Sequence, residues 1–563
     1  MKKPIPESRC LLLAGLLLFP LALPSCGDDT KGQAGAFETV SRKTADVAAD
    51  AGKLIPEGAV VVARFRNVNS LVENAKAVAE SFAPGSGAFV DVAPLLAMSG
   101  LRPKLVDMDG SPVFALSITE AGQLPQFIVP IKDADAAAGS SKIPNTLSGD
   151  YLGMGLEAKP VLASSTPAIG KNLPVADYAI RVDLKALLAQ YRPMIEPYLD
   201  PTALESLDPS IKENPAALGV VEMMTKATKE FLDDARRLDV ALSLDDGALD
   251  LDCVFELAGD RPESPSGSGM SLAQMLPMND AALYMVFESN WADFADTFLP
   301  MYDKMTVDLP KEQRDAFLDV IRASKELYAG MKGGGAFALD FAPQGMQSMG
   351  LMENEDPATY LKDYMSYIER YSKAIAPLPA EFKVVDFEGS SKVSVDGVDF
   401  QGLKMRFDMA AMMKSSGGVE LPLEQVKAMS SAMEQMIGKD GVSLYQGAHE
   451  KLVLMTIGSG DANATRLVSS VKKGQKHKNT VLEHASARLH DRPSYFIGMD
   501  LRRLAQQMHA FTDSITPMSI PAAPAGKPVI VWMSMAATDS GYGFQAHIDL
   551  AGIAELMKAM TPR

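Results

Sequence analysis

The chain has 563 residues, of which 47% are hydrophobic and 22% are charged, and its formal net charge at pH 7 is −17. This length exceeds the size at which one hydrophobic core keeps growing, so two or more domains are expected. The composition is typical of a globular protein and excludes a largely disordered one. The acidic balance disfavours DNA, RNA and anionic lipid headgroups as partners, because these also carry negative charge.

The first 25 residues have the organisation of an export signal. Lys2, Lys3 and Arg9 form a basic start, and residues 11–23 form an apolar stretch. That stretch is too short to span a bilayer of about 30 Å as a helix. The stretch ends at Leu23, and Pro24 and Ser25 then lead to Cys26.

This order resembles the signal of bacterial lipoproteins, whose lipobox cysteine is acylated and becomes the first residue of the mature chain. The resemblance implies lipid attachment at Cys26, removal of residues 1–25, and a folded part in the periplasm or outside the cell. Pro24 stands where the family usually has a small residue. An ordinary secretory signal, or an uncleaved helical anchor, is the alternative interpretation. Two or more acyl chains suffice for stable membrane attachment.

Cysteine usage is sparse. Cys10 lies in the signal and Cys26 is the expected lipid site, so Cys253 alone remains and no intramolecular disulfide can form in the mature chain. Cys253 lies in an alternating apolar run, where it is expected to be a small core residue. Residues 26–53 are rich in Ala, Gly, Asp, Lys and Thr, and we expect them to be a flexible tether.

A strand–Asp–helix pattern recurs along the chain. Residues 181–188 and 498–505 each end an apolar strand, place an Asp at a helix N-cap, and begin an amphipathic helix. Looser copies occupy residues 59–82 and 282–305. The expected caps of the four helices are Asn69, Asp183, Asn290 and Asp500.

The four units predict an internal duplication. Residues 54–258 form the first α+β repeat domain and residues 276–563 form a second, enlarged one. Between them, residues 259–275 are the expected linker, because residues 259–269 are rich in Gly, Ser and Pro and carry no periodic apolar residue. Each half contains a strand and helix followed by a hairpin, and the Asp245-Asp246-Gly247 turn marks the clearest hairpin.

The fold class predicted from this order is α+β, with two related domains that each contain a mainly antiparallel sheet with helices packed on one face. The layout is similar to uncharacterised families of exported bacterial proteins that repeat such a unit. This resemblance spans roughly residues 54–550 and implies no known activity.

The sequence contains no strong motif for catalysis, metal binding or cofactor binding. Asp183 and Asp500 are explained by helix capping without a catalytic role. All six histidines fall in the last 115 residues: His449, His477, His484, His490, His509 and His547. Their spacings match no metal-binding motif, so we expect them to be scattered over the surface. The Gly458-Ser459-Gly460 loop lacks the Lys-Ser/Thr of a phosphate-binding loop. No catalytic residue, metal site or cofactor is therefore predicted.

Two functions remain open. The first is a membrane-anchored envelope lipoprotein with a non-enzymatic binding or scaffolding role, whose partners are the membrane and another envelope protein or a ligand. The second is an envelope hydrolase with its active site in the cleft between the two repeat domains, since pockets are common at domain interfaces. Converging carboxylates or histidines with shifted pKa values would favour the hydrolase.

The lipid anchor is directly testable. If Cys26 is acylated, Cys26→Ser releases the protein from the membrane fraction, whereas the control Cys253→Ser stays bound. Fractionation followed by immunoblotting measures the distribution. Unchanged membrane association of Cys26→Ser contradicts the lipoprotein assignment.

Overall fold

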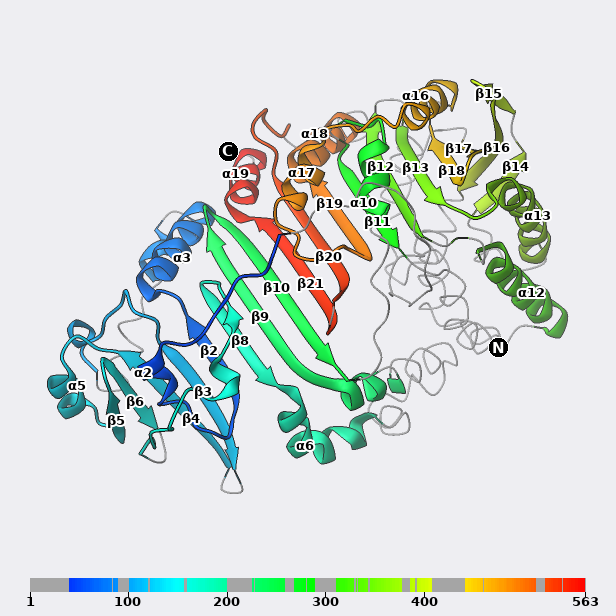
Figure 1. Ribbon diagram of the computed structural model, residues 1–563. Coiled ribbons are helices and arrows are strands. Elements are labelled where there is room, and N and C mark those ends of the chain that lie inside the picture. The colour runs from blue at the N-terminus through cyan, green and yellow to red at the C-terminus, as the bar shows by residue number, and fades with distance from the viewer. Residues whose placement is uncertain are drawn as a thin grey trace, which may run out of the picture.

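A computed structural model describes residues 40–83, 85–89, 101–119, 122–155, 159–199, 225–226, 228–258, 268–279, 281–288, 310–328, 331, 333–342, 345–376, 385–389, 392–407, 441–458, 460–512, 522–538 and 540–561. Its main feature is a long antiparallel sheet to which both halves of the chain contribute (Figure 1). Helices pack against this sheet, so the predicted α+β class is confirmed.

The first repeat supplies eight neighbouring strands, in the order β5-β6-β4-β3-β2-β8-β9-β10. Their bounds are β2 (Ala59–Phe65), β3 (Val113–Thr119), β4 (Gly122–Pro130), β5 (Asn145–Ser148), β6 (Tyr151–Gly155), β8 (Tyr178–Asp183), β9 (Ala235–Asp245) and β10 (Ala248–Leu257). Its helices are α2 (Ala49–Gly52), α3 (Val68–Phe82), α5 (Ala134–Ser140) and α6 (Leu184–Ile195).

The second repeat continues the sheet in the order β21-β20-β19-β11-β12-β13-β18-β17-β16. Both β14 and β15 pair with β16. The strand bounds are β11 (Leu283–Glu288), β12 (Gly334–Ala342), β13 (Gly345–Glu353), β14 (Val385–Gly389), β15 (Val393–Val395), β16 (Val398–Phe407), β17 (Val442–His449), β18 (Leu452–Ile457), β19 (Tyr495–Asp500), β20 (Ile530–Thr538) and β21 (Gly541–Asp549). The helices are α10 (Ser268–Met275), α12 (Lys311–Tyr328), α13 (Pro357–Ile375), α16 (Gly460–Lys472), α17 (Thr480–Ser486), α18 (Leu501–Thr512) and α19 (Leu550–Met560).

The two strand orders mirror each other, and their registers match. Val61 of β2 faces Leu116 of β3, and at the equivalent place Leu283 of β11 faces Leu339 of β12. The β5–β6 hairpin corresponds in the same way to β17–β18. The two halves are thus copies of one unit, related by an approximate two-fold axis between β10 and β21.

One turn shows how closely the copies agree. The tight turn after β5 begins with Gly149 at a φ of 51°, and the turn after β17 begins with Glu450 at a φ of 52°. Glycine adopts this left-handed conformation at little cost, whereas glutamate does so rarely. The second repeat therefore keeps the backbone of the turn although its residue type is unfavourable.

Helices cover much of the sheet face that carries Asp252, which we call the Asp252 face. In the first repeat α2 packs there, with Ala51 against Val62 and Ala115. In the second repeat α10, α16 and α17 pack on the same face around Phe496. The opposite face of the second repeat is covered by α13, so in this enlarged repeat helices lie on both faces rather than on the one expected.

Three of the four predicted caps fall on described residues. Asp183 accepts the Ala186 N–H at 2.9 Å, and Asp500 accepts the Arg503 N–H at 3.3 Å. The prediction for Asn69 is wrong by two positions, because α3 begins at Val68 and Asn67 accepts the Ser70 N–H. Asn69 instead donates to Asp109 at 2.9 Å. Asn290 lies outside the described residues.

Each repeat begins earlier in the chain than expected. Residues 268–275 belong to the predicted linker but form α10, because Met270, Leu272 and Ala273 are buried in the core of the second repeat. Residues 40–53 were expected to lie in the tether, but they pack on the fold. Val47 and Ala51 are buried, and β1 (Thr44–Ala45) pairs with β7 (Leu173–Pro174).

Candidate functional site

The sheet changes character where the two repeats meet. Directly facing residues share one face of a sheet, so a single row can be followed across the strands on the Asp252 face. From the first repeat to the second, the row reads Ile128, Val113, Arg64, Ala179, Ala241, Asp252, Gln545, Ser534, Phe496, Val286, Ala336 and Leu351. Its ends are apolar core, whereas Asp252, Gln545 and Ser534 in its middle are polar. We call this middle part of the sheet face, at β8–β10 and β20–β21, the seam.

A cavity of about 1060 Å³ lies over the seam. Its walls come from β8, β9 and β10 of the first repeat, from β20 and β21 of the second, and from residues 487–492 before β19. The N-terminal segment, residues 40–44, and residues between 168 and 176 complete the lining. A pocket between the repeats, which the sequence left as a possibility, is therefore present.

The N-terminal segment crosses the cavity as a strap. In Figure 1 it is the dark-blue chain that passes over the strands of the first repeat toward α17. Its Val40 N–H donates to the Leu489 carbonyl at 2.8 Å, and the Lys43 carbonyl accepts from Val175 N–H at 2.9 Å. One short segment thus contacts the second repeat at one end and the first repeat at the other.

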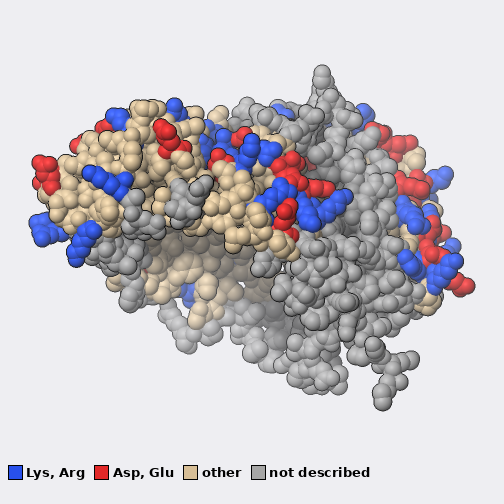
Figure 2. All heavy atoms as spheres, turned by 90° about the horizontal axis from the view of Figure 1, so that it is seen from below, with Lys and Arg blue, Asp and Glu red and all other residues tan. Residues whose placement is uncertain are grey.

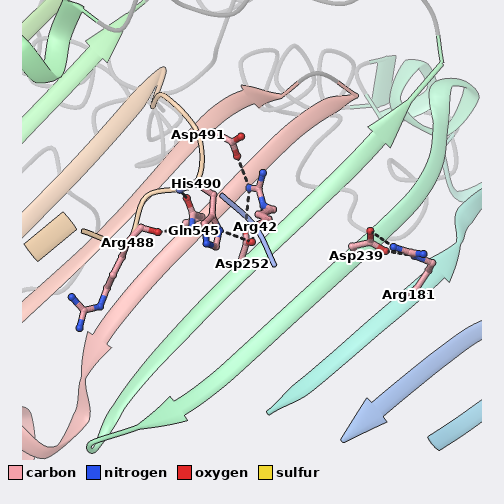
Figure 3. Close-up of polar contacts among 8 residues, drawn as sticks. All are labelled: Arg42, Arg181, Asp239, Asp252, Arg488, His490, Asp491 and Gln545. Atoms are coloured by element: carbon pink, nitrogen blue, oxygen red, sulfur yellow. Dashed lines mark hydrogen bonds and ion pairs between the residues drawn. The ribbon is translucent and has the colours of Figure 1, made fainter. Parts of the chain in front are cut away.

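Arg42 of the strap joins the parts through a polar network (Figure 3). Its Nε donates to Asp252 Oδ2 at 2.8 Å and its Nη2 to Asp252 Oδ1 at 3.1 Å, and it also pairs with Asp491. His490 Nδ1 lies 2.9 Å from Asp252 Oδ2. Gln545 Oε1 accepts the His490 backbone N–H at 2.8 Å. The network therefore links the strap, β10 and two segments of the second repeat.

The proton on His490 can be placed from these contacts. His490 Nδ1 lies 2.9 Å from both Asp252 Oδ2 and Gln545 Nε2. It can either donate a proton to the Asp252 carboxylate or accept one from the Gln545 amide, but it cannot do both at once. A proton on Nδ1 satisfies the charged carboxylate of Asp252. The Gln545 amide then donates to the Arg488 carbonyl, at 3.4 Å.

The network keeps Asp252 ionised. Burial by itself raises the pKa of Asp252, but hydrogen bonds from His490 and Arg42 and the charge of Arg42 outweigh it, so the net pKa is lowered. Burial lowers the pKa of Arg42, but its bonds to Asp252 and Asp491 outweigh that effect and raise it above the ordinary value. Both partners are therefore charged at neutral pH.

A second ion pair lies deeper in the seam, on β8 and β9. Arg181 Nε donates to Asp239 Oδ1 at 2.6 Å and Nη2 to Asp239 Oδ2 at 2.8 Å, and the Arg181 side chain is only 9% exposed. Such bidentate geometry offsets part of the cost of burying two charges. Arg237 also approaches Asp239, at 3.3 Å, and pairs with Glu256 at 2.8 Å.

Two histidines meet at the second-repeat side of the seam. The rings of His484 and His547 lie 4.3 Å apart, and His547 Nδ1 is 2.7 Å from Asp250 Oδ1. Trp532 Nε1 donates to His484 Nδ1 at 3.2 Å, which fixes His484 as neutral at that nitrogen. Burial, then the nearby His547, lowers the pKa of His484 to about 4. The expectation of scattered surface histidines is wrong for this pair, since His547 is 3% exposed.

Neither Ser470 nor Cys253 is placed as a nucleophile in the seam cavity. Ser470 Oγ lies 2.9 Å from His477 Nε2 and also donates to the Met275 carbonyl at 2.6 Å, and it is not among the residues that line the seam cavity. Cys253 alternates with Asp252 and therefore lies on the opposite sheet face. Burial, followed by the charge of Asp252, raises the pKa of its thiol. Within the described ranges, no group of three or more His, Cys, Asp or Glu side chains is placed to hold a metal ion.

The sequence-predicted site residues do not assemble at the seam. Asp183 and Asp500 serve as helix caps, each accepting a backbone N–H of the helix that follows. Cys26 falls outside the described residues. The seam residues were missed, although one signal was present: β10 alternates Leu249, Asp250, Leu251 and Asp252, which predicts one polar face.

Comparisons with known proteins give little. No family model matches the chain, and no curated protein matches it. Among solved structures, crystal form I of TP0453 is similar over 52% of this chain and 98% of its own, at 6% identity and a TM-score of 0.20. Crystal form III of TP0453 is similar over 51% and 97%, with the same identity and TM-score. A likeness this weak supports no argument. None of the described helices is long and apolar enough to cross a bilayer.

The network around Arg42 predicts a stability effect. Arg42→Met leaves the largely buried side chain of Asp252 without its cation, so we expect the free energy of unfolding at pH 7 to fall by about 2–4 kcal/mol. The control Arg192→Met removes a cation from an exposed pair with Glu196, so its loss of stability should be much smaller. Urea unfolding measures both, and equal small losses contradict the proposed role of the network.

The same network predicts a pH dependence. The pKa of Asp252 is lowered in the folded state, so its stabilisation is full above its unfolded pKa of about 3.9 and is lost as pH falls toward the folded value. Asp252→Asn should therefore destabilise equally at pH 7 and pH 5, and progressively less below pH 4. A loss that shrinks already between pH 7 and pH 5 contradicts this assignment.

Proposed function

We propose that this protein is a lipoprotein of the bacterial cell envelope, anchored through Cys26, that binds a polar ligand in the seam cavity. The export signal and the Cys26 position support the anchor. The folded part would lie in the periplasm or outside the cell, held to a membrane by lipid. In this proposal binding, rather than catalysis or scaffolding alone, is the purpose of the joint between the repeats.

One observation carries the binding role: the seam cavity has walls from the strap and from both repeats. A purely structural joint would be expected to fill this space with apolar side chains, as the rest of the same sheet face does. Here the floor is instead built from charged and amide side chains whose partners are mostly satisfied within the protein. Pre-organised polar groups around a concave space are typical of ligand sites.

The alternative, an envelope hydrolase in this cleft, has less support. A general acid needs a raised carboxyl pKa, and the pKa of Asp252 is lowered. The His490 Nδ1 is committed to Asp252, and His490 has no serine, threonine or cysteine side chain as a hydrogen-bond partner among the described residues. His484, whose pKa is about 4, accepts from Trp532 rather than from a nucleophile.

A variant that fills the cavity tests the binding role. Ser243 lines the cavity and faces Asp250 across β9–β10, so Ser243→Trp occupies ligand space. Thermal unfolding of purified Cys26→Ser protein is measured with citrate, pyrophosphate, an Asp-Glu dipeptide, maltose and spermidine. At least one probe should raise the Tm, and Ser243→Trp should abolish that rise.

The matched control is Ser394→Trp, on the exposed edge strand β15. It should keep the response of the parent protein. A panel in which no probe raises the Tm, or a rise that survives Ser243→Trp unchanged, favours a scaffolding role and contradicts binding in the cavity.

A further inference from the structure

The side chains that line the seam cavity are positive on balance, whereas the chain as a whole is negative. The protein carries a net charge of −17. The cavity nevertheless has seven lysine or arginine side chains among its lining residues and four carboxylates. The cations are Arg42, Lys43, Lys171, Arg181, Arg237, Arg488 and Arg492, and the carboxylates are Asp239, Asp250, Asp252 and Asp491.

The carboxylates are already engaged by partners inside the protein. Asp239 is paired with Arg181 and Arg237, and Asp250 with His547. Both Asp252 and Asp491 are paired with Arg42. A cationic ligand would therefore have to compete with these intramolecular bonds for every negative charge in the cavity.

Three of the cations are not engaged in this way. Lys43, Lys171 and Arg492 are exposed, and none of them has a carboxylate partner in the part of the chain that the structure describes. Arg488 is set aside, because Figure 3 shows its guanidinium directed away from the network around Asp252. On the described part of the face seen from below, Figure 2 shows lysines and arginines mixed with aspartates and glutamates.

The three free cations come from different parts of the molecule. Lys43 lies on the strap, Lys171 lies just before β7 in the first repeat, and Arg492 lies just before β19 in the second. Positive charge at the mouth of a concave site attracts and orients anions. Lysine and arginine bind carboxylate and phosphate groups through short charge-assisted hydrogen bonds.

We propose that the seam cavity binds a small anion with two or more carboxylate or phosphate groups, held by Lys43, Lys171 and Arg492. This inference rests on the proposed binding function and assigns its ligand a chemical class. An anion held in this way contacts the strap and both repeats at once, so binding draws the three parts together.

The test is calorimetric titration of the Cys26→Ser protein with citrate and with pyrophosphate. The two probes separate a carboxylate ligand from a phosphate ligand. Lys43→Ala/Lys171→Ala/Arg492→Ala should weaken binding by about tenfold or more, and added salt should weaken binding to the parent protein. The removed side chains are exposed, so the fold should survive, and far-UV circular dichroism checks this.

The control removes the same charge elsewhere. Lys104, Lys142 and Arg322 are exposed and lie away from the cavity lining, so Lys104→Ala/Lys142→Ala/Arg322→Ala should bind as the parent does. An equal loss in this control means that net charge alone acts, and it overturns the site. Binding of maltose or spermidine, but of neither anion, overturns the anion inference while the binding function stands. If no probe binds at millimolar concentration, both fail.

Discussion

The antiparallel pairing of β10 with β21 is the interaction on which the rest of the structure depends. Nine residues of β10, Ala248 to Glu256, face nine of β21, Asp549 to Gly541, without a break in register. Without this ladder each repeat would end in a long strand with unpaired backbone groups, which is an aggregation hazard. Because the two repeats have mirrored strand orders, β10 and β21 are equivalent edge strands. Their pairing satisfies the backbone groups of both at once.

The approximate two-fold axis passes between Asp252 and Gln545, which occupy equivalent places in the two copies and face each other directly. On either side the helices of each repeat cover an apolar part of the Asp252 face. Those helices stop short of the axis, so the seam must satisfy its polar groups by other means. The strap does so with Arg42, and residues 488–491 do so with His490, Asp491 and a backbone carbonyl.

The seam shows why two copies of one unit can acquire a property that neither has alone. Asp252 lies on the first repeat and Gln545 on the second, so the copies have diverged at the axis. At another equivalent place Arg181 of β8 corresponds to Gly498 of β19, and only the first repeat carries the buried ion pair with Asp239. The cavity is thus asymmetric although the backbone around it is nearly symmetric.

Much of the repeat unit could be predicted from local sequence. A near-continuous apolar run indicated a strand at the start of residues 59–82, and the Asp-Gly turn indicated the hairpin around Asp246-Gly247, because both signals are short-range. The same strand–Asp–helix signal occurs at Ile548-Asp549-Leu550 and was missed. Asp549 caps α19 with φ and ψ of −74° and 84°, close to the −76° and 89° of Asp183.

The candidate site was not predictable in the same way. The alternation of residues in β10 predicts that one face of this strand is polar. No feature of the nearby sequence indicates that β21 is the neighbouring strand. Residues 40–53 carry isolated apolar residues such as Val47, with no periodic pattern to suggest that this segment packs on the fold. Contacts between Arg42 and Asp252 span 210 residues, and only the three-dimensional arrangement reveals them.

The most direct test of the joined sheet uses a cysteine that the chain already has. Cys253 of β10 faces Phe544 of β21. Directly opposed Cα atoms in an antiparallel pair lie about 4.5–5.5 Å apart, within disulfide range, whereas diagonal neighbours lie about 7–8 Å apart. Under mild oxidation in a Cys26→Ser background, Phe544→Cys should crosslink to Cys253 rapidly, and Tyr542→Cys and Ala546→Cys should crosslink slowly. Efficient crosslinking of either neighbour, with none for Phe544→Cys, would contradict this register and the account built on it.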